Sequence, residues 1–389
     1  MSADDPFFHR DLTLRVRDRR LRLAVSQELF SSHTIDSGTL RLIKSLERLD
    51  LSPSSAVLDL GCGYGPLGLA AAVLAPEGRV TMVDRDALAV EYAARNAAAA
   101  SLAATAYGSL GYDDVGDGPF DLVVSNVPGK APPAVHEELV AGAARHLAPG
   151  GLAAIVVVEP LTALVDEMLE AAGAEVLLRD PSKAYSVFHY RFADAPRTVE
   201  PPGFAGGLYY RGELGAVRTS WGLPEFDQLG FATELALGLL GDEPGGDVGA
   251  VNPGQGHLAA ACSPATVTLA DRDLLALRTT AANLVTRSAA EQAIKLVHSS
   301  VPPGFPELDL GILSLRPKEP REVHVRQASS LAAALRPGGR IIVSGPATHV
   351  GRLVHAVAGD LRAGRTDQAR GHSAVELRTV RGRASDAVQ

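Results

Sequence analysis

Cysteine is nearly absent from this 389-residue sequence, which contains only Cys62 and Cys262. Two thiols can form neither a disulfide framework nor a four-cysteine zinc site. We therefore expect a protein without a metal centre that works in the reducing environment of the cytoplasm.

Long apolar segments are also missing. No run of about 18 uninterrupted apolar residues occurs, so we expect no membrane-spanning helix. The first residues, MSADDPFFHRD, show no basic region followed by an apolar one, and we expect no signal peptide. Hydrophobic residues make up 46% of the chain and charged residues 21%, which is typical of a folded globular protein.

The chain has no excess of positive charge. Residues 1–200 contain 18 Lys and Arg against 27 Asp and Glu, and the remaining residues contain 19 against 18. Neither half is therefore the basic body expected of a protein that binds nucleic acid by charge alone. The one basic segment contains Arg15, Arg17, Arg19, Arg20 and Arg22. Leucine and valine alternate with these arginines, which predicts a β-hairpin with its arginines in solvent.

The second half of the sequence repeats the first. AVLDLGCGYG at 56–65 corresponds to DVGAVNPGQG at 247–256, and VTMVDRD at 80–86 corresponds to VTLADRD at 267–273. Two later blocks, FDLVV at 120–124 and LAPGG at 147–151, match LDLGI and LRPGG 188 positions further on. Blocks that recur in the same order with small shifts indicate a duplicated domain.

Each half alternates short apolar runs with helical segments. In the first half the strands are predicted at 56–60, 80–83, 122–124 and 153–158, with helices at 86–100 and 133–146. This alternation predicts an α/β protein with two tandem Rossmann-like domains, each with a parallel sheet covered on both faces. Three prolines place the linker at 194–204, so we expect one domain over 1–198 and a second over 205–389.

A glycine-rich loop follows the first of these strands. Gly61, Gly63 and Gly65 let the chain turn tightly and let a ligand approach bare backbone. Asp84 ends the next strand, where its carboxylate can accept hydrogen bonds from ribose hydroxyls. Asp59 is placed to face a cationic amino-acid group and would repel a pyrophosphate. The pattern favours S-adenosylmethionine (SAM) over NAD, with an ordinary tight turn as the remaining alternative.

A second candidate site follows the strand near 122–124. The side-chain oxygen of Asn126 and the backbone carbonyl of Val127 can accept both N–H bonds of an amine and so aim its lone pair. Pro128 stiffens this turn. The alternative is a plain loop capped by asparagine, and nearby Lys130 and His136 are interpreted as solvated side chains.

These residues together resemble a known family, the class I SAM-dependent methyltransferases, and within it the small-domain group that includes ribosomal RNA guanine-N2 methyltransferases. The resemblance rests on DLGCGYG at 59–65, Asp84, SNVP at 125–128, LAPGG at 147–151, and Phe30-Ser31 followed by IDSGT at 35–39. It implies SAM as cofactor and transfer of a methyl group to nitrogen, with the guanine amino group of ribosomal RNA as substrate. It also places Ser109 at the adenine, where the group often has an acidic residue. Gly129 stands where the group has an aromatic residue that stacks on the target base.

The second half has lost most of this chemistry. Ala250 replaces Asp59, Asn252 replaces Gly61, Ser314 replaces Asn126, and Arg316 replaces Pro128. We therefore expect a degenerate, non-catalytic second copy. In the bacterial ribosomal RNA enzymes of the group the degenerate copy is instead the N-terminal one. Two alternatives remain: an enzyme that methylates a small natural product, and a non-catalytic protein that binds SAM or RNA.

Overall fold

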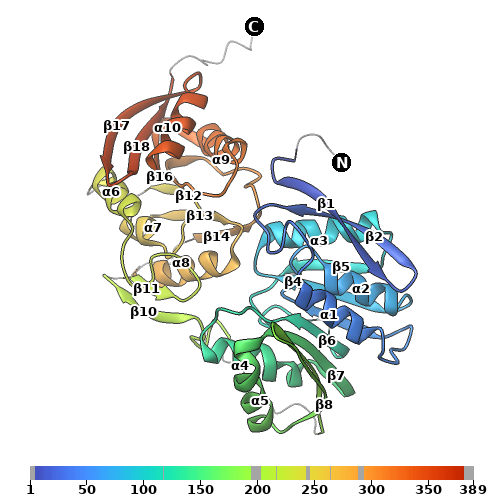
Figure 1. Cartoon of the computed structure of the whole chain (residues 1–389). Coiled ribbons are helices and arrows are strands. Elements are labelled where there is room, and N and C mark those ends of the chain that lie inside the picture. Colours follow the sequence, from blue (N-terminus) through green and yellow to red (C-terminus); the bar gives the residue numbers. More distant parts are fainter. Residues whose placement is uncertain are drawn as a thin grey trace. The chain divides into compact units, whose positions relative to one another are not determined.

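The computed structural model describes residues 5–116, 118–193, 203–215, 217–241, 246–262, 264–287 and 293–380. It divides into two compact units, one of Phe7–Tyr209 and the other of Tyr210–Gln389 together with Met1–Pro6 (Figure 1). Most of the predicted linker at 194–204 lies outside the described residues.

The first unit, drawn from blue to green in Figure 1, contains nine strands and five α-helices among its described residues. The strands are β1 (Phe8–Val16), β2 (Arg19–Ser26), β3 (Ala56–Leu60), β4 (Arg79–Asp84), β5 (Ala104–Gly108), β6 (Phe120–Asn126), β7 (Leu147–Val158), β8 (Ala174–Pro181) and β9 (Tyr185–Phe192). The helices are α1 (Ser37–Leu46), α2 (Pro66–Leu74), α3 (Ala87–Ala99), α4 (Pro133–Ala141) and α5 (Thr162–Ala171).

Seven of these strands form one sheet in the order β5-β4-β3-β6-β7-β9-β8. The first five are parallel, and β3 pairs with β4 on one side and with β6 on the other. Buried residues follow one another along β3 and β6, so both faces of the sheet are covered. The chain places β4 and β5 on one side of β3 and then crosses over to place β6 on the other side. Open α/β sheets bind ligands at the carboxyl edge beside such a switch point.

The structure corrects the predicted elements in two places. The sheet is not fully parallel, because β9 returns in a hairpin from β8 and lies antiparallel to both β7 and β8. The helix predicted at 133–146 ends at Ala141, and a short 3₁₀ turn over Gly142–Arg145 completes the segment.

The second unit repeats this architecture. Its seven-stranded sheet has the order β14-β13-β12-β15-β16-β18-β17, which is the strand order of the first unit. Its strands are β10 (Tyr210–Leu214), β11 (Val217–Ser220), β12 (Asp247–Val251), β13 (Thr266–Asp271), β14 (Ala293–His298), β15 (Leu308–Ser314), β16 (Leu335–Pro346), β17 (Leu361–Ala369) and β18 (His372–Thr379). Its helices are α6 (Phe231–Leu240), α7 (His257–Ala261), α8 (Leu274–Arg287), α9 (Arg321–Ala334) and α10 (Ala347–Ala356). The protein therefore has two tandem Rossmann-like α/β folds.

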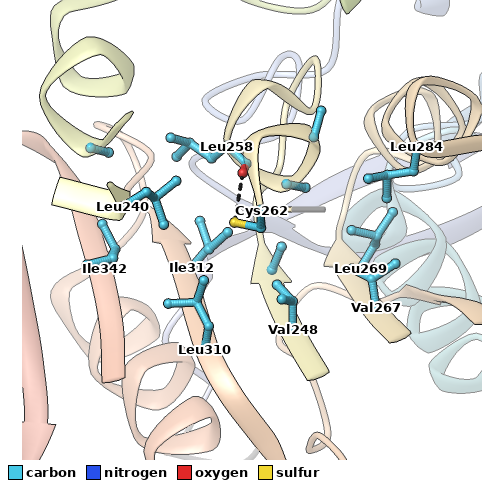
Figure 2. Close-up of a cluster of buried hydrophobic side chains, with 14 of the residues drawn as sticks. Leu240, Val248, Leu258, Cys262, Val267, Leu269, Leu284, Leu310, Ile312 and Ile342 are labelled. Carbon is cyan, nitrogen blue, oxygen red and sulfur yellow. Dashed lines mark hydrogen bonds between the residues drawn. The ribbon is translucent and has the colours of Figure 1, made fainter. Parts of the chain in front are cut away.

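Apolar side chains fill the interior of the second unit. Figure 2 shows one cluster, in which Val248, Ile312 and Ile342 from three sheet strands lie near Leu258 and Cys262 from the α7 region. The thiol of Cys262 donates to the carbonyl of Leu258 at 3.1 Å. A free buried cysteine packs like a small hydrophobic residue and is also a weak hydrogen-bond donor. Both cysteines are buried and free.

The predicted arginine hairpin is confirmed as β1 and β2, with Arg15 opposite Arg20 and the arginine side chains exposed. Asn96 on α3 ties this hairpin to the domain, because its carboxamide bonds both the N–H and the carbonyl of Ala24. Asn283 on α8 makes the same pair of bonds to Arg218 on β11, which pairs antiparallel with β10 as a second hairpin. This repeated asparagine is thus structural in both units.

Candidate functional site

The glycine loop after β3 has the conformation that glycine permits best. Gly61, Gly63 and Gly65 have φ angles of 73°, 56° and 93°, and Gly65 is the N-cap residue of α2. Apart from the glycine and its two neighbours in the chain, no heavy atom of the described residues lies within 4 Å of where a β-carbon at Gly61 or Gly63 would sit. The loop therefore offers bare backbone beside open space, which suits close approach by a ligand.

Asp84, at the end of β4, holds this loop in place. One carboxylate oxygen accepts from the N–H of Gly63 and the other from the N–H of Asp86, each at 2.9 Å. Burial raises the pKa of Asp84 to about 6, against the opposing effect of these N–H groups. The side chain is only partly covered, so its remaining acceptor positions can serve hydroxyl groups of a ligand.

Asp59 lies fully buried in β3 with an incomplete set of partners. One oxygen accepts from the N–H of Gly68 at 2.7 Å. None of the described residues donates a hydrogen bond to the other oxygen, Oδ1. Burial raises the pKa of this carboxyl to about 7, and the Gly68 N–H opposes the rise. A cation with N–H donors would supply what Oδ1 lacks.

Asn126, the last residue of β6, is oriented by the start of α1. Its Nδ2 group donates to Asp36 Oδ2 at 3.1 Å and to Thr39 Oγ1 at 2.9 Å. A carboxylate can only accept, so the nitrogen of the carboxamide must face Asp36. The carboxamide oxygen therefore faces away from both partners and is the atom left to accept from a substrate. Neither Asp36 nor Thr39 was predicted to lie at the site, although both belong to the IDSGT segment at 35–39.

The loop beyond Asn126 is held by a buried histidine. His136 is 2% exposed, and its Nε2 lies 2.8 Å from the carbonyl oxygen of Pro128. The interpretation of His136 as a solvated side chain was wrong, because α4 packs it under the loop. Val127 is also buried, and its N–H donates to the carbonyl of Val156 on β7 at 3.0 Å.

Ser109 follows β5 at the same edge of the sheet, and its side chain is used locally. It is 1% exposed, its hydroxyl donates to the carbonyl of Gly111 at 2.7 Å, and it accepts from the N–H of Asp114 at 3.2 Å. Its proposed contact with adenine stays a prediction.

The second unit keeps two of these features. In the first unit, Asp84 at the end of β4 accepts from the N–H of Asp86 before α3. The same hydrogen bond occurs in the second unit, where Asp271 accepts from the N–H of Asp273 at 2.8 Å. Loop closure by histidine is kept too, because His324 Nε2 lies 3.1 Å from the carbonyl of Arg316. Features present in both units thus belong to the fold.

The space for a ligand is not kept in the second unit. Asn252, at the position of Gly61, has φ 55° and donates from Nδ2 to the carbonyl of Ser314 at 3.0 Å. Arg316, at the position of Pro128, forms an ion pair with the fully buried carboxylate of Asp271. An asparagine side chain and a guanidinium therefore lie between the strand ends that the first unit leaves open.

The family model described as methyltransferase small domain matches residues 20–188. The match covers β2 through most of β9, including the glycine loop, Asp84 and Asn126.

Curated relatives of the small domain share about a third of its sequence. A ribosomal RNA small subunit methyltransferase C from Pseudomonas putida is 35% identical over 144 residues, which are 36% of this chain and 42% of that protein. The protein of the same name from Mannheimia succiniciproducens is 35% identical over 167 residues, 41% of this chain and 48% of that one. The chain thus spans less than half the length of these relatives.

A solved structure resembles the whole chain. It is the T. thermophilus 16S rRNA N2 G1207 methyltransferase in complex with AdoMet and guanosine, with a TM-score of 0.64 and 18% identity. The alignment covers 96% of this chain and 99% of that one, so the similarity in fold extends over both units.

Among the described residues, no helix is long and apolar enough to cross a membrane. No group of three or more metal-binding side chains occurs among the residues that the structure describes.

Proposed function

We propose that the first domain, residues 1–198, is a SAM-dependent methyltransferase that acts on the exocyclic amine of guanine in ribosomal RNA. Residues 205–389 form its degenerate, non-catalytic partner, and the enzyme works in the cytoplasm. The observation that carries the proposal is the orientation of Asn126, whose nitrogen is occupied and whose oxygen is left for an amine. The names of the curated relatives and the guanosine-bound neighbour support ribosomal RNA as the substrate.

The residues of the first domain fit SAM. The buried, unpartnered Oδ1 of Asp59 is complementary to the ammonium of its methionine end. Gly61 and Gly63 leave room for the nucleoside, and Asp84 would accept from its ribose hydroxyls. Ser109 stays our assignment for the adenine contact.

SAM would supply a methyl group already activated on a sulfonium. Transfer of that methyl group to the amine nitrogen would leave the S–C bonding pair on sulfur and release the surplus N–H proton to water. The residues of this chain act by placement: Asn126 Oδ1 and the Val127 carbonyl accept from the amine, and Pro128 with His136 holds the loop.

Gly129 favours a second candidate, a small natural product as methyl acceptor. A side chain at this position is restricted, because its β-carbon would lie 3.2 Å from Val158 Cγ2. The aromatic residue that the resemblance leads us to expect is absent, and Val158 would have to shift slightly to admit one. The acidic balance of the first half also disfavours a polyanion, which leaves RNA binding to the exposed arginines of the β1–β2 hairpin.

Tritiated methyl transfer from SAM to naked small-subunit rRNA and to assembled subunits tests the proposal, with mass spectrometry to identify N2-methylguanosine. We expect Asn126→Ala to lower kcat by about 10²–10³-fold while SAM affinity changes little. Ser314→Ala, the equivalent change in the second unit, is the matched control and should leave kcat unchanged. Incorporation into no form of RNA would exclude ribosomal RNA and favour the small-molecule enzyme.

Replacing Arg17, Arg19 and Arg20 by glutamate tests the hairpin. Methylation of RNA should be lost and its salt dependence flattened, since released counterions drive such binding. A small uncharged acceptor should be methylated as before. If RNA methylation survives the triple change, the hairpin is not the RNA-binding surface.

A further inference from the structure

Tyr185, the first residue of β9, contacts the start of α1. Its hydroxyl donates to Asp36 Oδ1 at 2.8 Å. Its ring lies against Gly38, where a β-carbon would come within 2.7 Å of the ring. Glycine at this position of α1 thus permits an approach that any other residue would block.

Asp36 links this tyrosine to Asn126. Oδ1 of Asp36 is taken by Tyr185, while Oδ2 accepts from Asn126 Nδ2 at 3.1 Å and from the N–H of Thr39 at 2.9 Å. The aspartate is therefore fixed at both oxygens, once by β9 and once by the first turn of α1. The carboxylate group of Asp36 cannot rotate without breaking one of these hydrogen bonds.

We infer that Tyr185 is a positioning residue for methyl transfer, and that it acts through Asp36 on Asn126. The inference rests on the proposed role of Asn126 and adds two residues that lie 149 positions apart in the sequence. The Tyr185 hydroxyl fixes the orientation of the Asp36 carboxylate, and this carboxylate fixes the carboxamide nitrogen of Asn126. The carboxamide oxygen is then directed at the amine.

The chain of hydrogen bonds also changes the strength of the acceptor. A carboxylate that accepts from Nδ2 draws positive charge toward that end of the carboxamide and leaves Oδ1 more negative. Hydrogen bonds in series polarise one another in this way. Asn126 Oδ1 is thereby a better acceptor for the amine than an asparagine bonded to neutral groups alone.

The second unit shows that the fold does not require this arrangement. In the first unit, Tyr185 on β9 pairs with Val158 on β7. The equivalent pair in the second unit is His372 on β18 with Pro346 on β16. His372 Nδ1 lies 3.1 Å from the carbonyl of Arg370. Asp227 follows Asp36 by 191 positions, the same shift as between the two glycine loops, and it is 3.4 Å from Arg211 and largely exposed. The linked residues therefore occur together in the unit that has Asn126.

Tyr185→Phe tests the inference, because it keeps the ring against Gly38 and removes only the hydroxyl. We expect kcat to fall, by up to about 100-fold, with KM and Kd for SAM within about twofold of wild type. In an Asn126→Ala background the same change should have no further effect, since the two residues act in one chain. An independent loss of kcat in that background would overturn the inference.

Tyr190→Phe on the same strand is the matched control. Its hydroxyl donates to the carbonyl of Val140 at 2.7 Å, away from Asp36, so this variant also loses one hydrogen bond of a tyrosine hydroxyl. We expect its kcat to match wild type. An equal fall in kcat for both phenylalanine variants would mean that Tyr185 is only structural.

A spectroscopic measurement separates this inference from the proposed activity. The sequence contains four asparagines, Asn96, Asn126, Asn252 and Asn283, so selective ¹⁵N-asparagine labelling of the full chain resolves each side-chain NH₂ group. Tyr185→Phe should shift the Asn126 pair and leave the other three in place, whatever the methyl acceptor proves to be. If the Asn126 pair does not move, the link through Asp36 is refuted, even in a chain that methylates RNA.

Discussion

Replacing Asp59 by asparagine should stabilise the SAM-free first domain progressively more as the pH rises. The fully buried carboxyl has a pKa of about 7 in the folded chain, raised by burial from an ordinary 3.8. Because the folded state holds the proton more tightly than the unfolded state, the ionisation of Asp59 destabilises the fold above pH 3.8. This cost grows until the pH passes the folded pKa near 7, and it is constant above that.

The size of the effect follows from the two pKa values. Each pKa unit corresponds to about 1.4 kcal/mol, so the buried carboxylate costs the folded state about 2 kcal/mol at pH 5 and about 4 kcal/mol at pH 8. Asparagine does not ionise, and this pH dependence disappears. Its NH₂ group would lie at the unpartnered oxygen and cost about 1–3 kcal/mol, but equally at both pH values. The variant should therefore gain about 2–3 kcal/mol over wild type between pH 5 and pH 8.

The measurement must distinguish the two units of the full chain. Urea unfolding followed by pulsed hydrogen exchange and mass spectrometry reads peptides from β3 and β6 separately from those of the second unit. Trp221, the single tryptophan of the sequence, belongs to the second unit, and its fluorescence transition serves as the internal control.

A stability difference between variant and wild type that stays constant from pH 5 to pH 8 would refute the reasoning. It would mean that Asp59 is charged and well solvated or well paired in the folded chain. A change in the Trp221 transition would show that the substitution acts outside the first unit.

Three further results are expected. SAM affinity of the wild type, measured by calorimetry, should fall by up to tenfold for each pH unit below about 7, as Asp59 takes up a proton, and a flat profile would exclude it as the ammonium partner. Arg316→Met should lower the unfolding free energy of the second unit, read by Trp221 fluorescence, by about 3 kcal/mol, because Asp271 is left charged and buried; an unchanged midpoint counts against the ion pair. Asn96→Ala should cost the first unit about 1–3 kcal/mol through unpaired backbone groups of the β1–β2 hairpin, and equal loss in both units would contradict a local role.

The repeat and the glycine loop were predictable because they depend on local rules. The strand predicted at 56–60 is confirmed with the expected boundaries. The arginine hairpin is confirmed with the expected alternation of side chains. Positive φ angles at Gly61, Gly63 and Gly65 follow from residue type, since glycine alone adopts them freely. The carboxyl edge of a parallel sheet then brings residues after β3, β4 and β6 together. Their binding and catalytic roles stay predictions.

The sequence by itself determined the tandem α/β architecture, the small domain, and which positions of the second half had changed. Only the tertiary structure decided how Asn126 is turned, because its partner Asp36 is 90 residues away and is fixed in turn by Tyr185 on an antiparallel strand. It likewise showed that Arg316 reaches back 45 residues to Asp271. Hydrogen bonds and ion pairs of this kind have no sequence period, since they depend on strand order and on how helices pack against the sheet.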